Sequence, residues 1–211
     1  MMTWHVITYT VTVSRWQPDA RDRLKRAALE LFAQQGFAAT TVPEIAARAG
    51  LTTRTFFRHY ADKREVLFGG AEIPALATRL IADAPADLDP VTLVSGGLRT
   101  VAETRFEGQR EQLRATRAII RSDDGLRERD LRKRADLSEA IQAGFAGRGV
   151  PATTAALLGQ VTVTLLYVSL DEWLDTDDDR TLFAVISGAL GSLRATMAAF
   201  PAGYGLRPTP P

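Results

Sequence analysis

The chain has 211 residues, of which 45% are hydrophobic and 24% charged, with a net charge of +1 and no cysteine. This composition is ordinary for a globular protein, and it excludes disulfides, cysteine nucleophiles and cysteine-based zinc sites. The two histidines, His5 and His59, cannot form a metal site by themselves. The longest apolar stretch, residues 161–170, is too short for a membrane span, so we expect no membrane segment. The lack of cysteine fits a cytoplasmic protein, and we expect neither a metal nor a cofactor.

The chain begins with an arm, residues 1–17, that alternates apolar residues with threonine and histidine. The pattern is strand-like, but no pairing strand follows, so we expect a flexible arm. Within it, Arg15 is a candidate for a contact in a DNA groove.

The first helix is predicted from its apolar spacing. Its buried stripe follows the i, i+3, i+4, i+7, i+8 pattern and consists of Leu24, Ala27, Ala28, Leu31 and Phe32. Asp19 is the expected N-cap, and Gly36 supplies the stop.

Two short helices follow within residues 41–60. Thr41 and Glu44 form a capping box for the first, and Thr52 is the expected N-cap of the second. Gly50 suits the left-handed backbone of the tight turn between them. This arrangement predicts a helix-turn-helix, with Phe56 and Tyr60 in its core.

The second of these helices carries side chains that suit DNA. Thr53, Arg54 and Thr55 occupy its first turn, where residues of a recognition helix meet base edges in the major groove. Arg54 can pair with guanine in a bidentate way, and Arg58 can reach a base or a phosphate. The hydroxyl of Thr41 is a further candidate for a phosphate contact.

Charge is distributed unevenly along the chain. Residues 15–65 contain ten Lys/Arg and six Asp/Glu, a net charge of +4, whereas the following residues carry −3. A basic module on an acidic body indicates a polyanionic partner for the first part, with chance asymmetry as the alternative.

The remainder of the chain is predicted to be helical. A helix is expected from residue 62 to about 82, kinked at Pro74. Five more segments follow, at about 90–104, 105–121, 125–146, 152–174 and 179–199, before a flexible tail at 201–211. The acidic residues between 171 and 179 are interpreted as a solvated loop that caps the last helix and not as a cation site.

Residues 20–67 resemble the DNA-binding module of the TetR family. The motif includes Leu31-Phe32, Gly36-Phe37, Thr40-Thr41-Val42, Ile45-Ala46, Ala49-Gly50, Thr55-Phe56-Phe57, His59-Tyr60 and Lys63 to Leu67. The resemblance implies an all-α fold, with a three-helix DNA-binding domain at residues 18–66 and a helical effector-binding and dimerisation domain at 67–200.

The resemblance also implies a set of DNA contacts. With the residues above, the candidates are Thr41, Thr52, Thr53, Arg54, Thr55, Phe57, Arg58, His59 and Lys63. The position of Phe57 is usually tyrosine in the family, so a phosphate hydrogen bond is lost here. Tyr60 stands where the family often has phenylalanine, and its hydroxyl needs a partner at the edge of the core.

For the second domain, we expect a homodimer formed by the last two helices, around an apolar 152–174 segment and the small residues Gly188 and Gly191. A monomer core is the alternative interpretation. Phe106, Tyr167 and Trp173 are candidate wall residues of an effector site, and Arg105 or Arg99 is a candidate anion partner. For each of these residues, core packing or a solvated surface charge is the favoured alternative interpretation.

These patterns predict a transcriptional regulator of operator DNA, released by a small-molecule effector and without enzymatic activity. Two alternatives remain open: a DNA-binding protein without an effector, and a helical enzyme. The enzyme alternative lacks a G-x-S-x-G, P-loop, dinucleotide or H-E-x-x-H motif. An apolar cavity in the second domain would favour an effector, whereas a filled core would oppose it.

Overall fold

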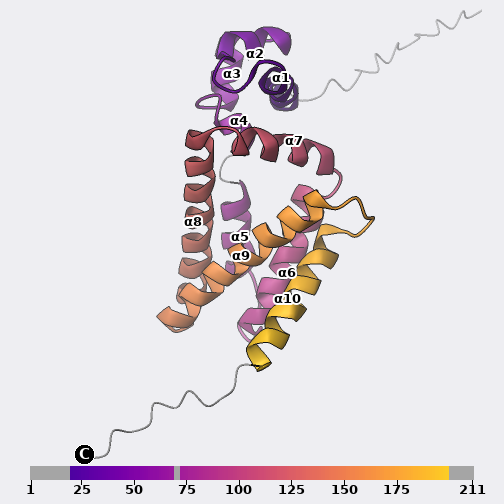
Figure 1. The fold of residues 1–211 in the computed structure, drawn as a ribbon. Coiled ribbons are helices and arrows are strands. Elements are labelled where there is room, and N and C mark those ends of the chain that lie inside the picture. The colour runs from indigo at the N-terminus through magenta and orange to yellow at the C-terminus, as the bar shows by residue number, and fades with distance from the viewer. Residues whose placement is uncertain (1–19, 69–71, 200–211) are drawn as a thin grey trace, which may run out of the picture.

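The computed structural model describes residues 20–68 and 72–199; the predicted arm, the Asp19 cap and the tail lie outside this part. Its elements are helical, with no strand in the described ranges, which confirms the all-α prediction (Figure 1). They are α1 (Ala20–Gln35), α2 (Val42–Arg48), α3 (Thr53–His59), α4 (Glu65–Phe68), α5 (Glu72–Ala82), α6 (Pro90–Val101), the π-helical turn η1 (Ala102–Phe106), α7 (Arg110–Arg121), α8 (Asp124–Gly147), α9 (Ala152–Asp175) and α10 (Leu182–Ala199).

The first three helices share a small apolar core at one end of the molecule. The predicted α1 stripe is buried throughout, and Phe56 and Tyr60 of the third-helix segment are buried with it. Ile119 of α7 and Leu126 of α8 belong to the same core. Figure 1 shows α7 lying across the base of this three-helix unit, so the unit rests on the end of the larger helical body.

The segment after the helix-turn-helix differs from its prediction. Instead of one helix kinked at Pro74, the structure has the separate helices α4 and α5. Pro74 lies in the first turn of α5, where its missing N–H removes no intrahelical hydrogen bond. Just before α4, the Asp62 carboxylate accepts hydrogen bonds from the backbone N–H groups of Arg64 (2.7 Å) and Glu65 (3.1 Å).

The predicted boundary between helices 90–104 and 105–121 is also wrong. Helix α6 passes into η1, and α7 begins only at Arg110. Gly108 adopts a φ of 81° between them, a left-handed conformation that ends the preceding helix. Arg105 and Phe106 therefore belong to a π-helical turn, a rare element that is frequent at functional sites.

Arginines of α7 hold the C-terminal end of α9. Arg110 donates hydrogen bonds to the carbonyl oxygens of Trp173, Thr176 and Asp178, and Arg114 Nε donates to that of Leu174 (2.7 Å). Cations that satisfy the last carbonyls of a helix stabilise its end. Three of the six acidic residues between 171 and 179, Asp171, Asp175 and Asp177, form ion pairs with arginines of α7, and no cluster that could hold a metal occurs among the described residues.

Helices α8 and α9 form the centre of the larger core. They approach closely at Gly159, where an added Cβ would lie 2.6 Å from the carbonyl oxygen of Ser138. Helix α8 carries two i, i+4 ion pairs, with Arg134 Nη2 2.5 Å from Asp130 Oδ2 and Arg132 Nη2 3.5 Å from Glu128 Oε1. They order the α8 surface but contribute only about 0.3–0.5 kcal/mol each.

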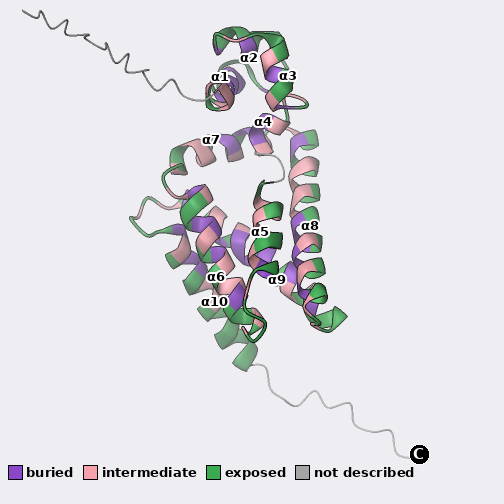
Figure 2. Ribbon diagram, turned by 180° about the vertical axis from the view of Figure 1, so that it is seen from behind, coloured by how far each residue is buried: buried purple, intermediate pink, exposed green. Residues whose placement is uncertain are grey.

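The last two helices leave apolar surface exposed. Leu157, Val161 and Val168 of α9 are exposed, and most of α10 beyond Ile186 is at most half-buried (Figure 2). By length and mean hydropathy (1.5 for each), α9 and α10 could span a bilayer, contrary to the expectation from the shorter unbroken apolar run. Core helices of globular proteins can meet the same criterion, and α9 packs extensively on α8.

Candidate DNA-binding surface and effector cavities

The turn between α2 and α3 is held from outside by α1. Gly50 has a φ of 64°, the left-handed conformation that the sequence predicted. Arg23 Nη2 donates hydrogen bonds to the carbonyl oxygens of Ala49 (2.5 Å) and Gly50 (3.4 Å). Sequence reasoning missed Arg23, because no local pattern links a residue on α1 to a turn 26 residues later.

The predicted capping box at the start of α2 is present. The backbone N–H of Thr41 donates to Glu44 Oε2 (2.7 Å), and the backbone N–H of Glu44 donates to Thr41 Oγ1 (3.4 Å). The Thr41 hydroxyl also donates to Glu44 Oε2 (2.7 Å), and these bonds from Thr41 hold the pKa of Glu44 below its ordinary value. A phosphate contact from this hydroxyl, as predicted, must therefore compete with Glu44.

Helix α3 presents a polar outer face with one exposed aromatic residue. Thr52 caps the helix as predicted, accepting a hydrogen bond from the backbone N–H of Thr55 (3.1 Å). Arg54 and Arg58 are exposed and make no hydrogen bond or ion pair within the described residues. Phe57 is 54% exposed, although its neighbour Phe56 is fully buried. The outer face also includes Thr53, so the predicted base-contacting residues share one accessible surface.

Two of the predicted DNA contacts, Lys63 and His59, have polar atoms that face inward in this structure. The ammonium group of Lys63 donates to the carbonyl oxygens of Phe37 (2.8 Å), Ala38 (3.3 Å) and Thr40 (2.8 Å). An ammonium has three N–H donors, so this geometry leaves none for a phosphate. His59 is half-buried, and its Nε2 is buried without a partner among the described residues. The geometry therefore supports a structural role for Lys63.

Tyr60 has the hydrogen-bond partner that the sequence led us to expect for its hydroxyl. Its hydroxyl donates to the carbonyl oxygen of Arg21 (3.2 Å), and burial raises the pKa of the phenol. The Arg21 guanidinium lies over the Tyr60 ring and pairs with Glu72 of α5, with Nη1 2.5 Å from Oε1. These contacts connect the end of α3 to the first turn of α5.

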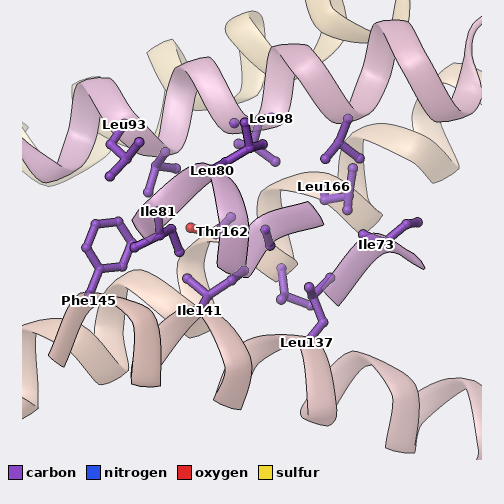
Figure 3. Close-up of a pocket in the computed structure, with 15 residues that line it drawn as sticks. Ile73, Leu80, Ile81, Leu93, Leu98, Leu137, Ile141, Phe145, Thr162 and Leu166 are labelled. Atoms are coloured by element: carbon purple, nitrogen blue, oxygen red, sulfur yellow. The ribbon is translucent and has the colours of Figure 1, made fainter. Parts of the chain in front are cut away.

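The larger helical body contains an apolar gap between α5, α6, α8 and α9. Side chains from the four helices converge there, and the hydroxyl oxygen of Thr162, drawn in red, lies among them (Figure 3). The gap has a volume of about 50 Å³, well below the roughly 300–1,000 Å³ typical of ligand pockets. It therefore has no room for an organic ligand in this conformation.

Two larger cavities adjoin each other nearer to the three-helix unit. Their volumes are about 430 and 370 Å³, and they share seven lining residues: Leu67, Phe68, Ile73, Phe106, Leu113, Lys133 and Tyr167. Two of the predicted wall residues, Phe106 and Tyr167, therefore line the same space. Burial raises the pKa of Tyr167 to about 12, so its phenol stays protonated.

The third predicted wall residue lies elsewhere. Trp173 lines neither of these cavities; its indole N–H donates to the carbonyl oxygen of Arg180 (2.8 Å), and Arg110 lies over its ring. It packs in the core because α7 covers the end of α9. Of the two candidate anion partners, Arg105 lines the 430 Å³ cavity, whereas Arg99 lies over the ring of Phe183.

More basic than acidic side chains line the two cavities. Seven Lys/Arg and four Asp/Glu line them, a net charge of +3. The basic residues are Lys25, Arg105, Arg117, Arg121, Arg127, Lys133 and Arg134, and the acidic ones are Glu72, Asp130, Asp136 and Asp171. Apolar walls with a basic margin suit an amphipathic or anionic molecule better than a cation.

Comparison with known proteins agrees with this geometry. The family model described as bacterial regulatory proteins, tetR family, matches residues 24–69, which span α1 to α4. Residues 24–69 therefore match the DNA-binding module of the tetR family. The chain is 40% identical over 94 residues to the HTH-type transcriptional regulator TcmR of Streptomyces glaucescens. It is 33% identical over 109 residues to an HTH-type transcriptional repressor of Mycobacterium tuberculosis.

These sequence matches cover only part of each protein. They include 43% and 48% of this chain, which in turn spans 41% and 56% of the length of these relatives. The shared part contains the helix-turn-helix. The larger helical body therefore has to be compared by its fold.

Solved structures share the fold over most of the chain. A TetR-family regulator of Syntrophomonas wolfei covers 87% of this chain and 97% of its own, with a TM-score of 0.56 and 18% identity. NalD of Pseudomonas aeruginosa, described as the secondary repressor of a multidrug efflux pump, covers 83% and 95%, with a TM-score of 0.55 and 20% identity. At these identities the likeness shows a shared fold and carries no information on function or ligand.

Proposed function

We propose that this chain is a sequence-specific, DNA-binding transcriptional repressor that acts as a cytoplasmic homodimer and leaves its operator when a small-molecule effector binds. The observation that carries this proposal is the outer face of α3. There Thr53, Arg54, Phe57 and Arg58 are exposed together on a helix whose start and preceding turn are both fixed by hydrogen bonds. The relatives over this region are named transcriptional regulators, with no enzyme among those described above.

The roles on α3 follow from chemistry and position. Arg54, in the first turn, is placed to donate two parallel hydrogen bonds to a guanine. Arg58, one turn later, can reach the phosphate backbone, and the exposed ring of Phe57 can contact sugar or a thymine methyl group. Thr41 and Thr52, at the starts of the two helices, complete the surface.

The proposed dimer uses the exposed faces of α9 and α10. Leu157, Val161 and Val168 lie at spacings that place them on one side of α9. On α10, Gly188 and Gly191 face open space, which permits close approach of a second helix. A two-fold dimer suits a palindromic operator and would place the α3 helices about 34–36 Å apart, one turn of DNA.

The two adjoining cavities favour an effector over regulation without one. They offer space of ligand size, with Phe106 and Tyr167 in the walls. An effector lowers operator affinity to the extent that it prefers a conformation with a different α3 spacing.

The proposal is tested by binding of the purified protein to the intergenic DNA upstream of its own gene, compared with a scrambled duplex across a salt series. We expect tight binding to the genomic duplex that survives nonspecific competitor and falls in the Arg54→Ala variant. Weak binding that is equal on both duplexes and steeply dependent on salt would contradict the proposal, since it would reflect phosphate attraction alone.

A further inference from the structure

The 430 Å³ cavity is lined by residues of the three-helix unit and of the larger helical body. Lys25 belongs to α1 of the helix-turn-helix unit, Glu72 to α5 and Arg105 to η1. Much of the remaining wall is apolar and includes Phe106 of η1 and Leu166 of α9. Lys25, Glu72 and Arg105 thus form a charged end of the cavity near the three-helix unit, and, among the described residues, Lys133 and Asp136 of α8 are the only other charged ones that line it.

Arg105 has an unused donor at the charged end. Its Nη1 lies 3.6 Å from Oε2 of Glu72, beyond hydrogen-bonding distance. Its Nε is buried and has no hydrogen-bond partner in the described part of the chain. A buried N–H of a guanidinium without an acceptor is costly, so an additional acceptor at this position would be stabilising.

Lys25 provides a second cation at the same end. Burial lowers the pKa of its ammonium group, and the nearby positive charge of Arg21 lowers it further. The negative charges of Asp22 and Glu72 raise this pKa but do not reverse the shift. Within residues 20–68 and 72–199, Lys25 has no ion pair or hydrogen bond. Glu72 is thus already shared by Arg21 and Arg105, and it makes no ion pair with Lys25.

We propose that this cavity binds an organic anion with an apolar body, whose acidic group lies between Lys25 and Arg105 and competes with Glu72 for Arg105. The inference deepens the proposed function, because it names the chemical class of the effector. The anion supplies the acceptor that Arg105 Nε lacks and a counter-charge for Lys25, while the apolar walls hold the rest of the molecule.

The same site provides a route to the DNA-binding surface. An anion between Lys25 and Arg105 joins α1 directly to η1. It also changes the surroundings of Glu72, the carboxylate that pairs with Arg21. Since the carbonyl oxygen of Arg21 accepts the hydrogen bond from Tyr60 at the end of α3, the ligand acts on the element that positions the recognition helix.

The test uses a matched pair of fluorescent probes with the full-length protein. The probe 1-anilinonaphthalene-8-sulfonate carries a sulfonate, and N-phenyl-1-naphthylamine has the same rings without it. Both are titrated into the wild type, Arg105→Gln and Lys25→Gln. Arg79→Gln is the control, because Arg79 is exposed on α5 and lines neither cavity.

We expect each cavity variant to weaken binding of the sulfonate by about tenfold, as the loss of a charged hydrogen bond implies. Binding of the neutral probe should change little, which also shows that the variants fold. Arg79→Gln should match the wild type with both probes. Equal sulfonate affinity in all four proteins, or parallel loss of both probes in the cavity variants, would overturn the inference.

Operator binding is measured on the same samples. If the sulfonate requires Arg105 but the wild type binds no operator, the proposed function fails while the anion site stands. If the wild type binds its operator but sulfonate binding is indifferent to Arg105 and Lys25, only the present inference fails.

Discussion

Arg23 on α1 and Ala49 at the end of α2 are joined by a hydrogen bond of 2.5 Å from the guanidinium to the carbonyl oxygen. The bond fixes the turn that sets the angle between α2 and the recognition helix. It thereby links the core of the three-helix unit to the geometry of the DNA-binding surface.

Replacing Arg23 should weaken both stability and DNA binding. Arg23→Ala removes the donor to Ala49 and Gly50, and we expect a loss of about 1–2 kcal/mol in the free energy of unfolding, measured by urea denaturation. Arg26→Ala is the matched control, because Arg26 is exposed on the same helix and has no partner among the described residues. Equal effects of the two substitutions would contradict a specific role for Arg23.

Gly50 and Gly96 should respond to alanine in opposite directions. Gly50 has a φ of 64°, and an added Cβ would lie 3.0 Å from Arg23 Nη2, so Gly50→Ala should destabilise the protein by about 1–2 kcal/mol. Gly96 lies within α6 with open space around it, and Gly96→Ala should stabilise by up to about 1 kcal/mol. Thermal unfolding measures both shifts. A neutral Gly50→Ala would show that the turn does not need its left-handed residue.

Acid should weaken the start of α2 through Glu44. Hydrogen bonds from Thr41 lower the pKa of Glu44 below its ordinary value of 4.5. The contribution of the carboxylate is therefore fully present above pH 4.5 and is lost as the pH falls through the lower, folded-state pKa. The difference in unfolding free energy between wild type and Glu44→Gln should shrink between pH 6 and pH 3 (about the range set by an ordinary glutamate). A difference that is constant with pH would refute this account.

The exposed α9 face should control oligomeric state. Val161→Glu places a charge on the proposed dimer surface, where it would be buried without a partner. We expect sedimentation velocity to show a dimer for the wild type and a monomer for Val161→Glu. Glu139→Gln is the control, because Glu139 is exposed on α8; this variant should remain dimeric. A Val161→Glu protein that stays dimeric would place the interface elsewhere.

Local features of the fold were predictable from sequence because each depends on neighbours within a few residues. The α1 stripe, the Thr41 and Thr52 caps and the turn at Gly50 follow from spacing and backbone preference. The break predicted between residues 104 and 105 lay too early in the chain, because the preceding helix ends at the left-handed Gly108 and α7 begins only at Arg110.

Contacts between distant side chains were not predictable in the same way. The hydrogen bonds of Lys63 to carbonyls 23 to 26 residues away, and those of Arg110 to the end of α9, depend on how the helices pack. For the same reason the sequence could not separate cavity walls from core. It grouped Trp173 with Phe106 and Tyr167, although only the last two line the cavities.

The most direct test of the central claim is a base-pair substitution scan of the operator, carried out with wild type and with Arg54→Ala. If α3 reads bases, Arg54→Ala should lose discrimination at one G·C position in each half-site, by about 1–3 kcal/mol, and keep the wild-type profile elsewhere. Arg26→Ala should leave the whole profile intact. An Arg54→Ala profile that matches the wild type at every position would contradict the assignment of α3 as the recognition helix.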